Sequence, residues 1–428
     1  MRGGPVSGRL PDFPWDKLTS YAATARAHAD GIVDVGPEAG EKGGHILYSG
    51  PPAGLKLVEQ SHTRRYLFGD QRMPSRTPRK PTAWLRLEGV TRNNLHGLDV
   101  DLPLGVLASV TGVSGSGKST LVSQVLVDLV GAELGQETAT EAEEEVDALG
   151  QDATIPTEGR IVRGMEGIKR LVRVDQKPIG RTPRSNLATY TGLFDHVRKL
   201  FAATKMARAR KYDAGRFSFN VAKGRCEHCE GEGQVMVELL FLPSVYAPCP
   251  TCAGARYNAK TLEVTYKERN IAEVLGMTVD AAAAFFADEV SIARSLEVLR
   301  DVGLGYLRLG QPATELSGGE AQRIKLATEL QRAARGNMLY ILDEPTTGLH
   351  PADVDRLLVQ LDRLVEAGNS VIAVEHNMRV VAASDWVIDI GPGAGELGGT
   401  VVASGSPHEV AGSALSRTAP YLRNFLAI

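Results

Sequence analysis

The stretch GVSGSGKS at residues 112–119 follows an apolar run, 106–113, and precedes a helix-like segment, 120–130. Four residues separate Gly112 from Gly117, and Lys118 and Ser119 come next. This is the spacing of a P-loop, whose backbone N–H groups face a phosphate while the lysine reaches the β- and γ-phosphates and the serine holds Mg²⁺. A chance Gly/Ser loop is disfavoured because strand, loop and helix all agree. The predicted nucleotide-binding residues of this stretch are Gly112, Ser114, Gly115, Gly117, Lys118, Ser119 and Thr120.

Composition places the chain among globular proteins of two or three domains. Its 428 residues carry 48 Lys and Arg against 51 Asp and Glu, a net charge of −3, and 43% of the residues are hydrophobic. Any nucleic-acid surface must therefore be a local patch. No apolar run reaches the roughly 18 residues of a membrane helix, and the start has no signal-peptide core, so we expect a cytoplasmic protein without a membrane partner.

An internal repeat links two distant parts of the chain. Residues 30–52, DGIVDVGPEAGEKGGHILYSGPP, match residues 385–407, DWVIDIGPGAGELGGTVVASGSP, without a gap. The period is far too long for a solenoid unit. Upstream the match fades, and no second P-loop precedes the first copy. We interpret the first copy as a terminal hairpin with its flanking helix, whose strand edges lack the sheet that they should complete.

Two segments around the P-loop region predict surface connections. Residues 69–83, GDQRMPSRTPRKPTA, are basic and proline-rich and predict a solvated linker. Residues 133–147, ELGQETATEAEEEVD, are acidic with no aromatic residue and predict a disordered or frayed insertion. Residues 84–104 alternate between apolar and polar side chains, which indicates strands leading to the P-loop.

A basic and aromatic mixture fills residues 181–225, with Tyr190, Phe194, Tyr212, Phe217 and Phe219 among the basic side chains. Such a mixture suits a surface that binds a phosphate backbone and stacks bases. Solvated helix faces above buried aromatics are the open alternative. The predicted DNA contacts are Arg181, Arg184, Lys205, Arg208, Arg210, Lys211 and Arg216.

All four cysteines lie in two C-x-x-C pairs, Cys226 with Cys229 and Cys249 with Cys252, separated by 19 residues. This spacing predicts a tetrahedral Zn²⁺ site, with a strand at 235–242 running between the pairs. Four thiolates leave zinc no open position, so its predicted role is structural. Two disulfides or free thiols are the alternatives.

A second glycine-rich helix start follows at residues 316–323, LSGGEAQR. Its exposed backbone N–H groups at a helix N-terminus predict another anion site. The residues assigned to this nucleotide contact are Ser317, Gly318, Gly319 and Glu320.

Carboxylate, amide and imidazole side chains end three apolar segments. Asp343 and Glu344 end 338–342, Gln176 follows 161–175, and His376 comes just after 370–374. Beside a P-loop, the first carboxylate holds Mg²⁺ and the second polarises the attacking water, while Gln176 senses and His376 contacts the γ-phosphate. Glu344, Gln176 and His376 are the predicted catalytic residues.

Taken in order, GVSGSGKST, the Gln176 loop, LSGGEAQR, LDEPTTGLH and VEHN resemble the ABC-type ATPase cassette. More narrowly, DQKPIGRTPRSNLATYTG, GRFSFNVAKGRCEHCEGEG and LGYLRLGQPATELSGGEAQR, with the C-x-x-C pairs, resemble the C-terminal half of the UvrA family. Members of that family are the damage-recognition subunits of the bacterial UvrABC nucleotide-excision repair system. The resemblance covers about 84–412, and 27–69 resembles the end of the family's first cassette.

The resemblance implies an α/β fold, an ABC-type P-loop ATPase cassette with an inserted helical signature domain and a Cys₄ zinc module. It also implies ATP, Mg²⁺ and Zn²⁺ as cofactors, binding to lesions in duplex DNA, and transfer to UvrB, without nuclease activity. The implied domains are a first-cassette remnant 1–68, the linker 69–83, cassette parts 84–180 and 311–412, an inserted signature and DNA-binding region 181–310 with zinc module 226–252, and a tail 413–428.

The chain departs from the family in carrying one P-loop and one signature instead of two. ABC sites are composite, so an active site requires a second cassette, either in a homodimer or in a separately encoded first half. The family's UvrB-binding region belongs to that first half. A UvrA-like paralogue in self-resistance to a DNA-binding drug, or a non-hydrolysing DNA-binding zinc protein, is the alternative function.

Overall fold

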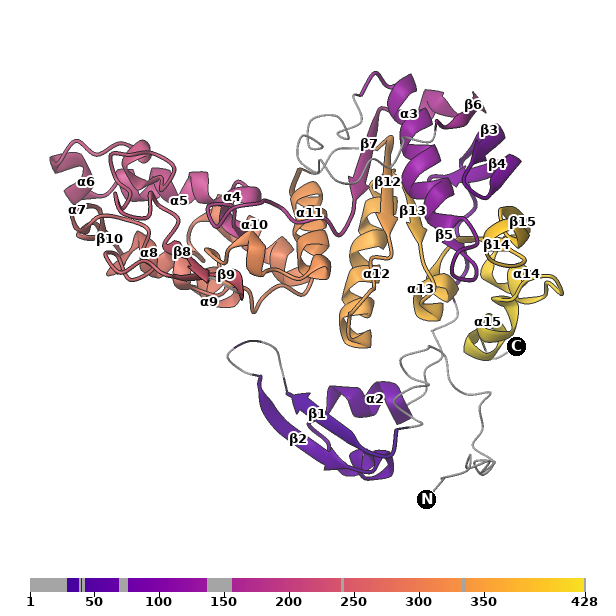
Figure 1. Ribbon diagram of the computed structural model, residues 1–428, viewed down its shortest axis with the longest axis horizontal. Helices are drawn as coiled ribbons and strands as arrows, with labels where there is room; N and C mark the ends of the chain where they lie inside the picture. The colour runs from indigo at the N-terminus through magenta and orange to yellow at the C-terminus, as the bar shows by residue number, and fades with distance from the viewer. Residues whose placement is uncertain are drawn as a thin grey trace.

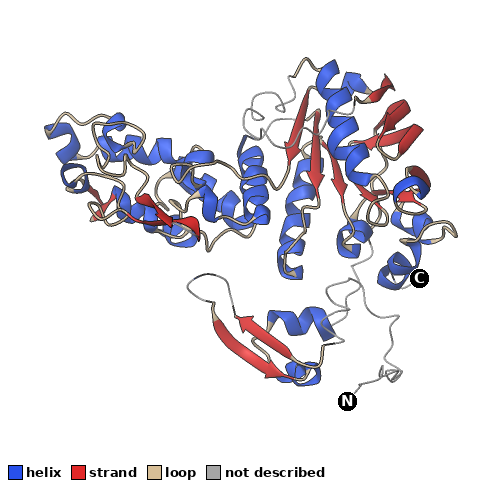
Figure 2. Cartoon of the chain, in the orientation of Figure 1, coloured by secondary structure: helices blue, strands red, loops and turns tan. Residues whose placement is uncertain are grey.

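The computed structural model describes residues 29–37, 40, 43–68, 76–136, 156–239, 242–332 and 336–426. Figure 1 shows three parts: a nucleotide-binding-type sheet with its helices, an elongated helical region beside it, and a small N-terminal unit below both. Figure 2 shows that the strands concentrate in the first part and the helices dominate the second. The predicted sheet and the predicted inserted segment thus lie in different parts of the molecule.

The main sheet has six strands in the order β15-β14-β5-β13-β12-β7. All pairs are parallel except β14 with β15. Every residue of β5 and β13 is buried, as expected for central strands covered on both faces. The strands are β5 (Leu107–Thr111), β7 (Arg170–Val174), β12 (Met338–Asp343), β13 (Ser370–Val374), β14 (Trp386–Gly391) and β15 (Thr400–Gly405).

Different elements cover the two faces of this sheet. One face packs against the helix after the P-loop and against a three-stranded antiparallel sheet, β4-β3-β6. The other face packs against α11, α12 and α13. The elements of the first face are β3 (Ala83–Arg92), β4 (Leu95–Leu104), β6 (Glu158–Arg163), the π-helical η4 (Thr120–Leu126) and α3 (Val127–Glu133). The helices of the other face are α11 (Gly318–Arg332), α12 (Pro351–Glu366) and α13 (Met378–Ala383). The remaining elements of this part of the chain are α14 (Pro407–Ala411), α15 (Ala419–Leu426) and the 3₁₀ turns η5 (Met165–Gly167) and η8 (Gly395–Leu397).

The helical region lies in the chain between β7 and α11, and its core is continuous with that of the main sheet. Phe194, Phe217 and Phe219 are buried in this core, so the predicted stacking role does not hold for them. The elements are α4 (Leu187–Tyr190), α5 (Leu193–Ala202), α6 (Lys205–Ala209), η6 (Ala214–Phe217), β8 (Gln234–Leu239), β9 (Leu242–Pro248), α7 (Ala259–Leu262), β10 (Thr265–Tyr266), β11 (Arg269–Asn270), α8 (Ile271–Gly276), α9 (Val279–Phe285), α10 (Val290–Asp301) and η7 (Ala313–Glu315).

The N-terminal unit reproduces the conformation of the C-terminal repeat. Its strands β1 (Ile32–Gly36) and β2 (His45–Gly50) pair with a register shift between Asp34 and Val35, and β14 and β15 show the same shift one repeat later. η3 (Pro52–Leu57) and α2 (His62–Phe68) follow, at the positions of α14 and α15. β1 and β2 form a sheet of their own, whereas β14 joins β5. The internal repeat is therefore structural, and the first copy lacks the larger sheet.

The described end of the predicted linker, 76–82, is bound to the cassette and is not a solvated tether. Asp385, whose side chain is fully buried, accepts hydrogen bonds from Arg79 N (2.9 Å), from Arg76 Nη2 (3.0 Å) and from Leu107 N (2.9 Å). Arg76 and Arg79 also pair with Asp362 of α12. A buried carboxylate needs such partners, which explains why this basic segment is held beside the start of β5.

Two predicted features have only partial structural counterparts. α3 ends at Glu133, and most of the acidic segment, from residue 137 on, lies outside the described residues, as do residues 1–28 of the predicted remnant. Among the helices that the structure describes, none is long and apolar enough to cross a bilayer.

Candidate functional site

The P-loop leaves β5 and turns back into its helix through three glycines with positive φ, Gly112, Gly115 and Gly117. A Cβ on Gly112 would lie 2.0 Å from the carbonyl oxygen of Ile390, so only glycine fits there. Lys118 Nζ donates to the carbonyl oxygens of Gly112 (3.0 Å) and Val113 (2.9 Å). Burial lowers the pKa of Lys118, although nearby carboxylates oppose this. The Lys118 side chain thus folds back over the P-loop, at the place where a bound phosphate would lie.

An unpartnered donor inside the loop supports an anion at this position. The hydroxyl of Ser116 is buried and has no hydrogen-bond partner among the described residues. Such a group costs free energy unless another molecule satisfies it. Together with the lysine and the glycines, it makes the loop fit a nucleotide phosphate.

Hydroxyl and carboxylate oxygens meet beside the loop. Ser119 Oγ lies 3.5 Å from Asp343 Oδ1, and Ser123 Oγ donates to Asp343 Oδ2 at 2.8 Å. These are the ligand types that Mg²⁺ prefers. Ser123 was not predicted from the sequence; its position one helical turn after Ser119 is the signal that could have found it.

The three predicted catalytic residues come together at the carboxyl ends of the strands. Gln176 Nε2 donates to the backbone carbonyl of Glu344 at 3.2 Å, and His376 Nε2 lies 3.7 Å from Glu344 Oε2. Thr347 Oγ1 also donates to Glu344 Oε2 at 3.2 Å. Glu344 itself has a φ of +45°, a conformation that L-residues rarely adopt. This strained backbone aims its carboxylate toward His376.

Glu375 is a buried carboxylate at this edge to which the sequence assigned no role. It accepts hydrogen bonds from Thr346 N (3.1 Å), Thr346 Oγ1 (3.0 Å), His376 N (3.2 Å) and Asn377 N (3.2 Å). Burial raises the pKa of Glu375 to about 7 even though these donors favour its charged form. The side chain therefore joins the segment after Glu344 to the segment that carries His376.

The predicted signature residues form the start of α11. Ser317 N and Oγ donate to Glu320 Oε2 at 2.8 and 2.9 Å, and Glu320 N donates back to Ser317 Oγ at 3.3 Å. Glu320 thus caps its own helix. A Cβ on Gly318 would lie 3.3 Å from Gln176 Cβ, so the helix start rests against the Gln176 loop. Ser317 is exposed, and Gly318, Gly319 and Glu320 are half-buried.

The four cysteines of the predicted metal site converge, with all Sγ atoms within 4.8 Å of one another. None of the four cysteines forms a disulfide, so the disulfide alternative is not realised. Sulfurs at 2.3 Å from a tetrahedral zinc lie about 3.8 Å apart, and Cys229 Sγ is 3.7 Å from Cys252 Sγ. Burial raises the pKa of Cys249, but backbone N–H groups of Cys252 and Thr251 outweigh it and hold the pKa at about 6. The cluster fits Zn²⁺ in ligand type and spacing.

The predicted DNA contacts differ in their exposure and in their acidic and polar partners. Arg184 pairs with Glu230 and Glu232, Arg210 pairs with Glu263, and Arg216 donates to Thr261 and Asn258. Lys205, Arg208 and Lys211 are exposed on and just after α6, and Arg181 is exposed on the loop after Gln176. Their contact with DNA stays a prediction.

The ABC transporter family description matches residues 95–347. The chain is similar to UvrABC system protein A of Streptomyces avermitilis, with 52% identity over 93% of this chain and 38% of the relative. It is also similar to UvrABC system protein A of Neisseria meningitidis, with 50% identity over 96% of this chain and 42% of the relative. The crystal structure of UvrA2 from Deinococcus radiodurans matches 94% of this chain and 47% of its own chain, at 67% identity and a TM-score of 0.87. The chain thus spans about two fifths of the length of these curated relatives.

Proposed function

The chain belongs to the ABC transporter family, and from this premise we propose that it is a UvrA-type ATPase that recognises lesions in duplex DNA and loads UvrB for nucleotide-excision repair. The observation that carries the proposal is the similarity to UvrABC system protein A at 52% identity over 93% of the chain. So wide a match takes in the helical region and the cysteine cluster as well as the cassette. A likeness of the P-loop cassette alone would support only ATP binding.

The nucleotide site of the proposal uses the residues that meet at the edge of the main sheet. Lys118 and the P-loop amides bind the phosphates, while Ser119 and Asp343 hold Mg²⁺. Bound ATP supplies a γ-phosphoryl group that water can attack. Glu344 orients and polarises that water, Gln176 holds the backbone of Glu344, and His376 stands next to its carboxylate. No residue of this set serves a nuclease reaction.

The zinc module of the proposal is structural. Cys226, Cys229, Cys249 and Cys252 supply a closed Cys₄ set at the base of the β8–β9 hairpin. A link between this module and the nucleotide site is supported by Arg256, just after the last cysteine, which donates to the carbonyl oxygens of Pro183 (2.9 Å) and Gly310 (3.0 Å). These two carbonyls lie on the segments that leave Gln176 and approach the signature.

The N-terminal unit is, in this proposal, the end of a second ABC cassette. Val33 and Val35 are 61% and 59% exposed, whereas their counterparts in the repeat, Ile388 and Ile390, are 0% and 1% exposed. The counterparts are buried because β14 pairs with β5. A second cassette core would cover the exposed face, and its P-loop would meet the signature of this chain.

The pairing of β5 bears on whether that second cassette is another copy of this chain or a separately encoded first cassette. β5 is already bonded to β13 on one side and to β14 on the other. A second copy of the chain therefore has no free edge of its own β5 to offer to β1. This favours a separate first cassette over a homodimer for completing the N-terminal unit.

The proposal is tested by ATP turnover of the purified chain over a wide concentration range, with Glu344→Gln as control. We expect Glu344→Gln to bind ATP and to lose turnover by at least about 100-fold, since the group that polarises water is removed. Turnover per chain that rises with concentration indicates composite sites. Turnover that survives Glu344→Gln would contradict the assignment of this residue.

A UvrA-like paralogue that protects against a DNA-binding drug is the second candidate. The paralogue part of this alternative is favoured by the 67% identity to UvrA2, compared with 50–52% to the UvrABC system protein A relatives, while protection against a drug follows only from the family resemblance. Binding to lesion-bearing and intact duplexes of the same sequence separates the two, because only a repair scanner must prefer the lesion. A chain that binds DNA equally in both forms and never hydrolyses ATP would be the non-hydrolysing zinc protein.

A further inference from the structure

Tyr66 of α2 is enclosed by residues from the two segments that carry Glu344 and His376. Its hydroxyl donates to Asp355 Oδ2 at 2.9 Å, and its ring meets the His350 ring edge-on, with centroids 5.4 Å apart. The Arg379 guanidinium lies over the same ring, 5.4 Å from its centroid. Three residues that are distant in sequence from α2 thus surround one aromatic side chain.

These three contacts lie where the catalytic segments become helices. His350 caps the N-terminus of α12, six residues after Glu344, and Asp355 lies in the second turn of that helix. Arg379 lies in the first turn of α13, three residues after His376. Arg379 also forms a two-pronged ion pair with Asp355, so the two helix starts are joined to each other as well as to Tyr66.

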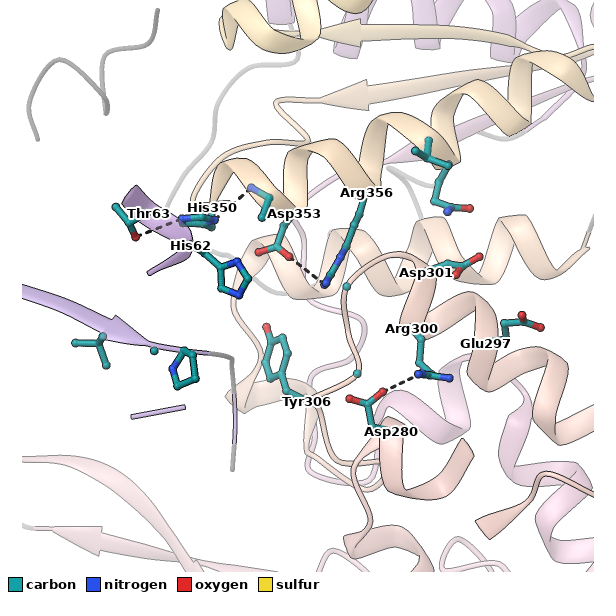
Figure 3. Close-up of a pocket in the computed structure, with 18 of the residues that line it drawn as sticks. His62, Thr63, Asp280, Glu297, Arg300, Asp301, Tyr306, His350, Asp353 and Arg356 are labelled. Atoms are coloured by element: carbon teal, nitrogen blue, oxygen red, sulfur yellow. Dashed lines mark hydrogen bonds and ion pairs between the residues drawn. The ribbon is translucent and has the colours of Figure 1, made fainter. Parts of the chain in front are cut away.

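A second contact of α2 supports the same docking. Figure 3 shows Thr63 joined to His350 at the start of α12, on the wall of a cavity of about 840 Å³ between the N-terminal unit and the cassette. Thr63 Oγ1 also donates to Asp34 Oδ1 at 2.7 Å, which ties this contact to β1. Tyr306, which donates to the signature residue Glu320, lines the same cavity.

The chemistry at Tyr66 favours a stable contact. Burial, helped by the hydrogen bond to Asp355, raises the pKa of Tyr66, so its hydroxyl stays protonated and remains a donor. A hydroxyl bound to a carboxylate and a ring under a guanidinium each stabilise more than neutral contacts do.

We propose that Tyr66 is a positioning residue of the nucleotide site: it holds the starts of α12 and α13, and so couples the placement of the N-terminal unit to Glu344 and His376. This rests on the proposed ATPase function. If the N-terminal unit ends a second cassette, docking of that cassette determines the positions of Glu344 and His376 through Tyr66. This docking does not change the phosphate-binding part of the site, which the P-loop forms.

The test compares Tyr66→Ala and Tyr66→Phe with Tyr48→Phe. Tyr48 lies in the same unit, and its hydroxyl donates only locally, to the carbonyl oxygen of Pro51 at 2.6 Å, which makes it a matched control. We expect kcat for ATP to fall about tenfold in Tyr66→Ala and about threefold in Tyr66→Phe, with KM within twofold, because small misplacement of catalytic groups affects turnover more than binding. Tyr48→Phe should match the unchanged chain.

Amide hydrogen exchange over 345–356 and 376–383 provides a readout independent of turnover. Exchange in both segments should increase in Tyr66→Ala and stay unchanged in Tyr48→Phe. In the Asp355→Ala background, Tyr66→Phe should cause no further loss of kcat, because the carboxylate that accepts from the Tyr66 hydroxyl is already absent.

Unchanged exchange in both segments would overturn the proposal, as would a rise in KM at constant kcat. No turnover at any concentration would mean that the site needs a separate second cassette, whereas a chain that also fails to bind ATP would contradict the proposed ATPase function; in both cases the exchange experiment alone decides the role of Tyr66.

Discussion

At the scale of single residues, the buried carboxylate of Glu375 is important both for its protonation and for the backbone groups that it binds. Glu375 is almost fully buried and accepts four hydrogen bonds from Thr346, His376 and Asn377. It therefore holds the backbone on either side of the hydrolytic end of the site. Glu344, in contrast, is partly exposed, and the hydrogen bond that it accepts from Thr347 lies at the surface.

Glu375 should give the chain a measurable pH dependence of stability. Because its folded pKa, about 7, lies above the ordinary value of 4.5, the folded protein binds this proton more tightly than the unfolded chain. The contribution is complete below about pH 4.5 and is lost as the pH rises to about 7. We expect the free energy of unfolding, relative to Glu375→Gln, to fall by roughly 3 kcal/mol over this range and to stay constant above it.

Urea denaturation of the unsubstituted chain and of Glu375→Gln at several pH values checks this expectation. The difference between the two proteins isolates the titration of Glu375 from that of the other groups. A difference that does not change between pH 4.5 and 7 would mean that the four donors keep Glu375 charged in the folded state.

At the scale of elements, the cysteine cluster determines the base of the β8–β9 hairpin. Both C-x-x-C turns use left-handed backbone at Glu230, Gly231, Ala253 and Gly254, and Gly233 N donates to Cys229 Sγ at 3.3 Å. The cysteines form a small cluster separate from the two cores of the main sheet. Local folding of this element should therefore depend on the metal while the cassette does not.

We expect the purified chain to hold about one zinc ion, and Cys249→Ser to lower zinc affinity by more than about 100-fold, because a ligand is lost. The region around 226–252 should then become sensitive to protease, while nucleotide binding at the P-loop persists. Metal analysis and limited proteolysis measure both effects. His228→Ala is the control, since His228 lies between two cysteines and is not part of the converging set. Equal zinc content in Cys249→Ser would refute the site.

At the scale of the whole molecule, the two copies of the repeat show one hairpin in two environments. The copies share the register shift of their hairpins, yet only the second copy completes a sheet. Local sequence therefore decides the hairpin conformation, and its environment decides burial. Val33, Val35 and Ile46 of the first copy are 61%, 59% and 68% exposed.

Matched substitutions in the two copies test this difference. Ile388→Ala removes a fully buried side chain and should lower the free energy of unfolding by about 2–5 kcal/mol. Val33→Ala, at the equivalent position, should change it by less than about 0.5 kcal/mol, because the side chain is exposed. Urea unfolding followed by circular dichroism measures both. A comparable loss for Val33→Ala would show that the N-terminal unit has a core of its own.

The sequence by itself determined the P-loop, the signature helix, the cysteine pairs and the internal repeat, and the family resemblance drawn from them is confirmed. These features depend on spacing over a few residues, so local sequence is enough to identify them. The strand ends that carry Gln176, Asp343 and His376 could also be read from apolar runs, because each of these residues lies within two positions of the end of its run.

Only the tertiary structure decided what depends on contacts between distant residues. The burial of Phe194, Phe217 and Phe219, the capture of the 76–82 segment by Asp385, and the role of Glu375 each require partners far away in sequence. The contact of Tyr66 with Asp355 spans 289 positions, and nothing local to either residue indicates it. Sequence patterns report which face of an element is apolar, whereas strand order and packing determine what that face meets.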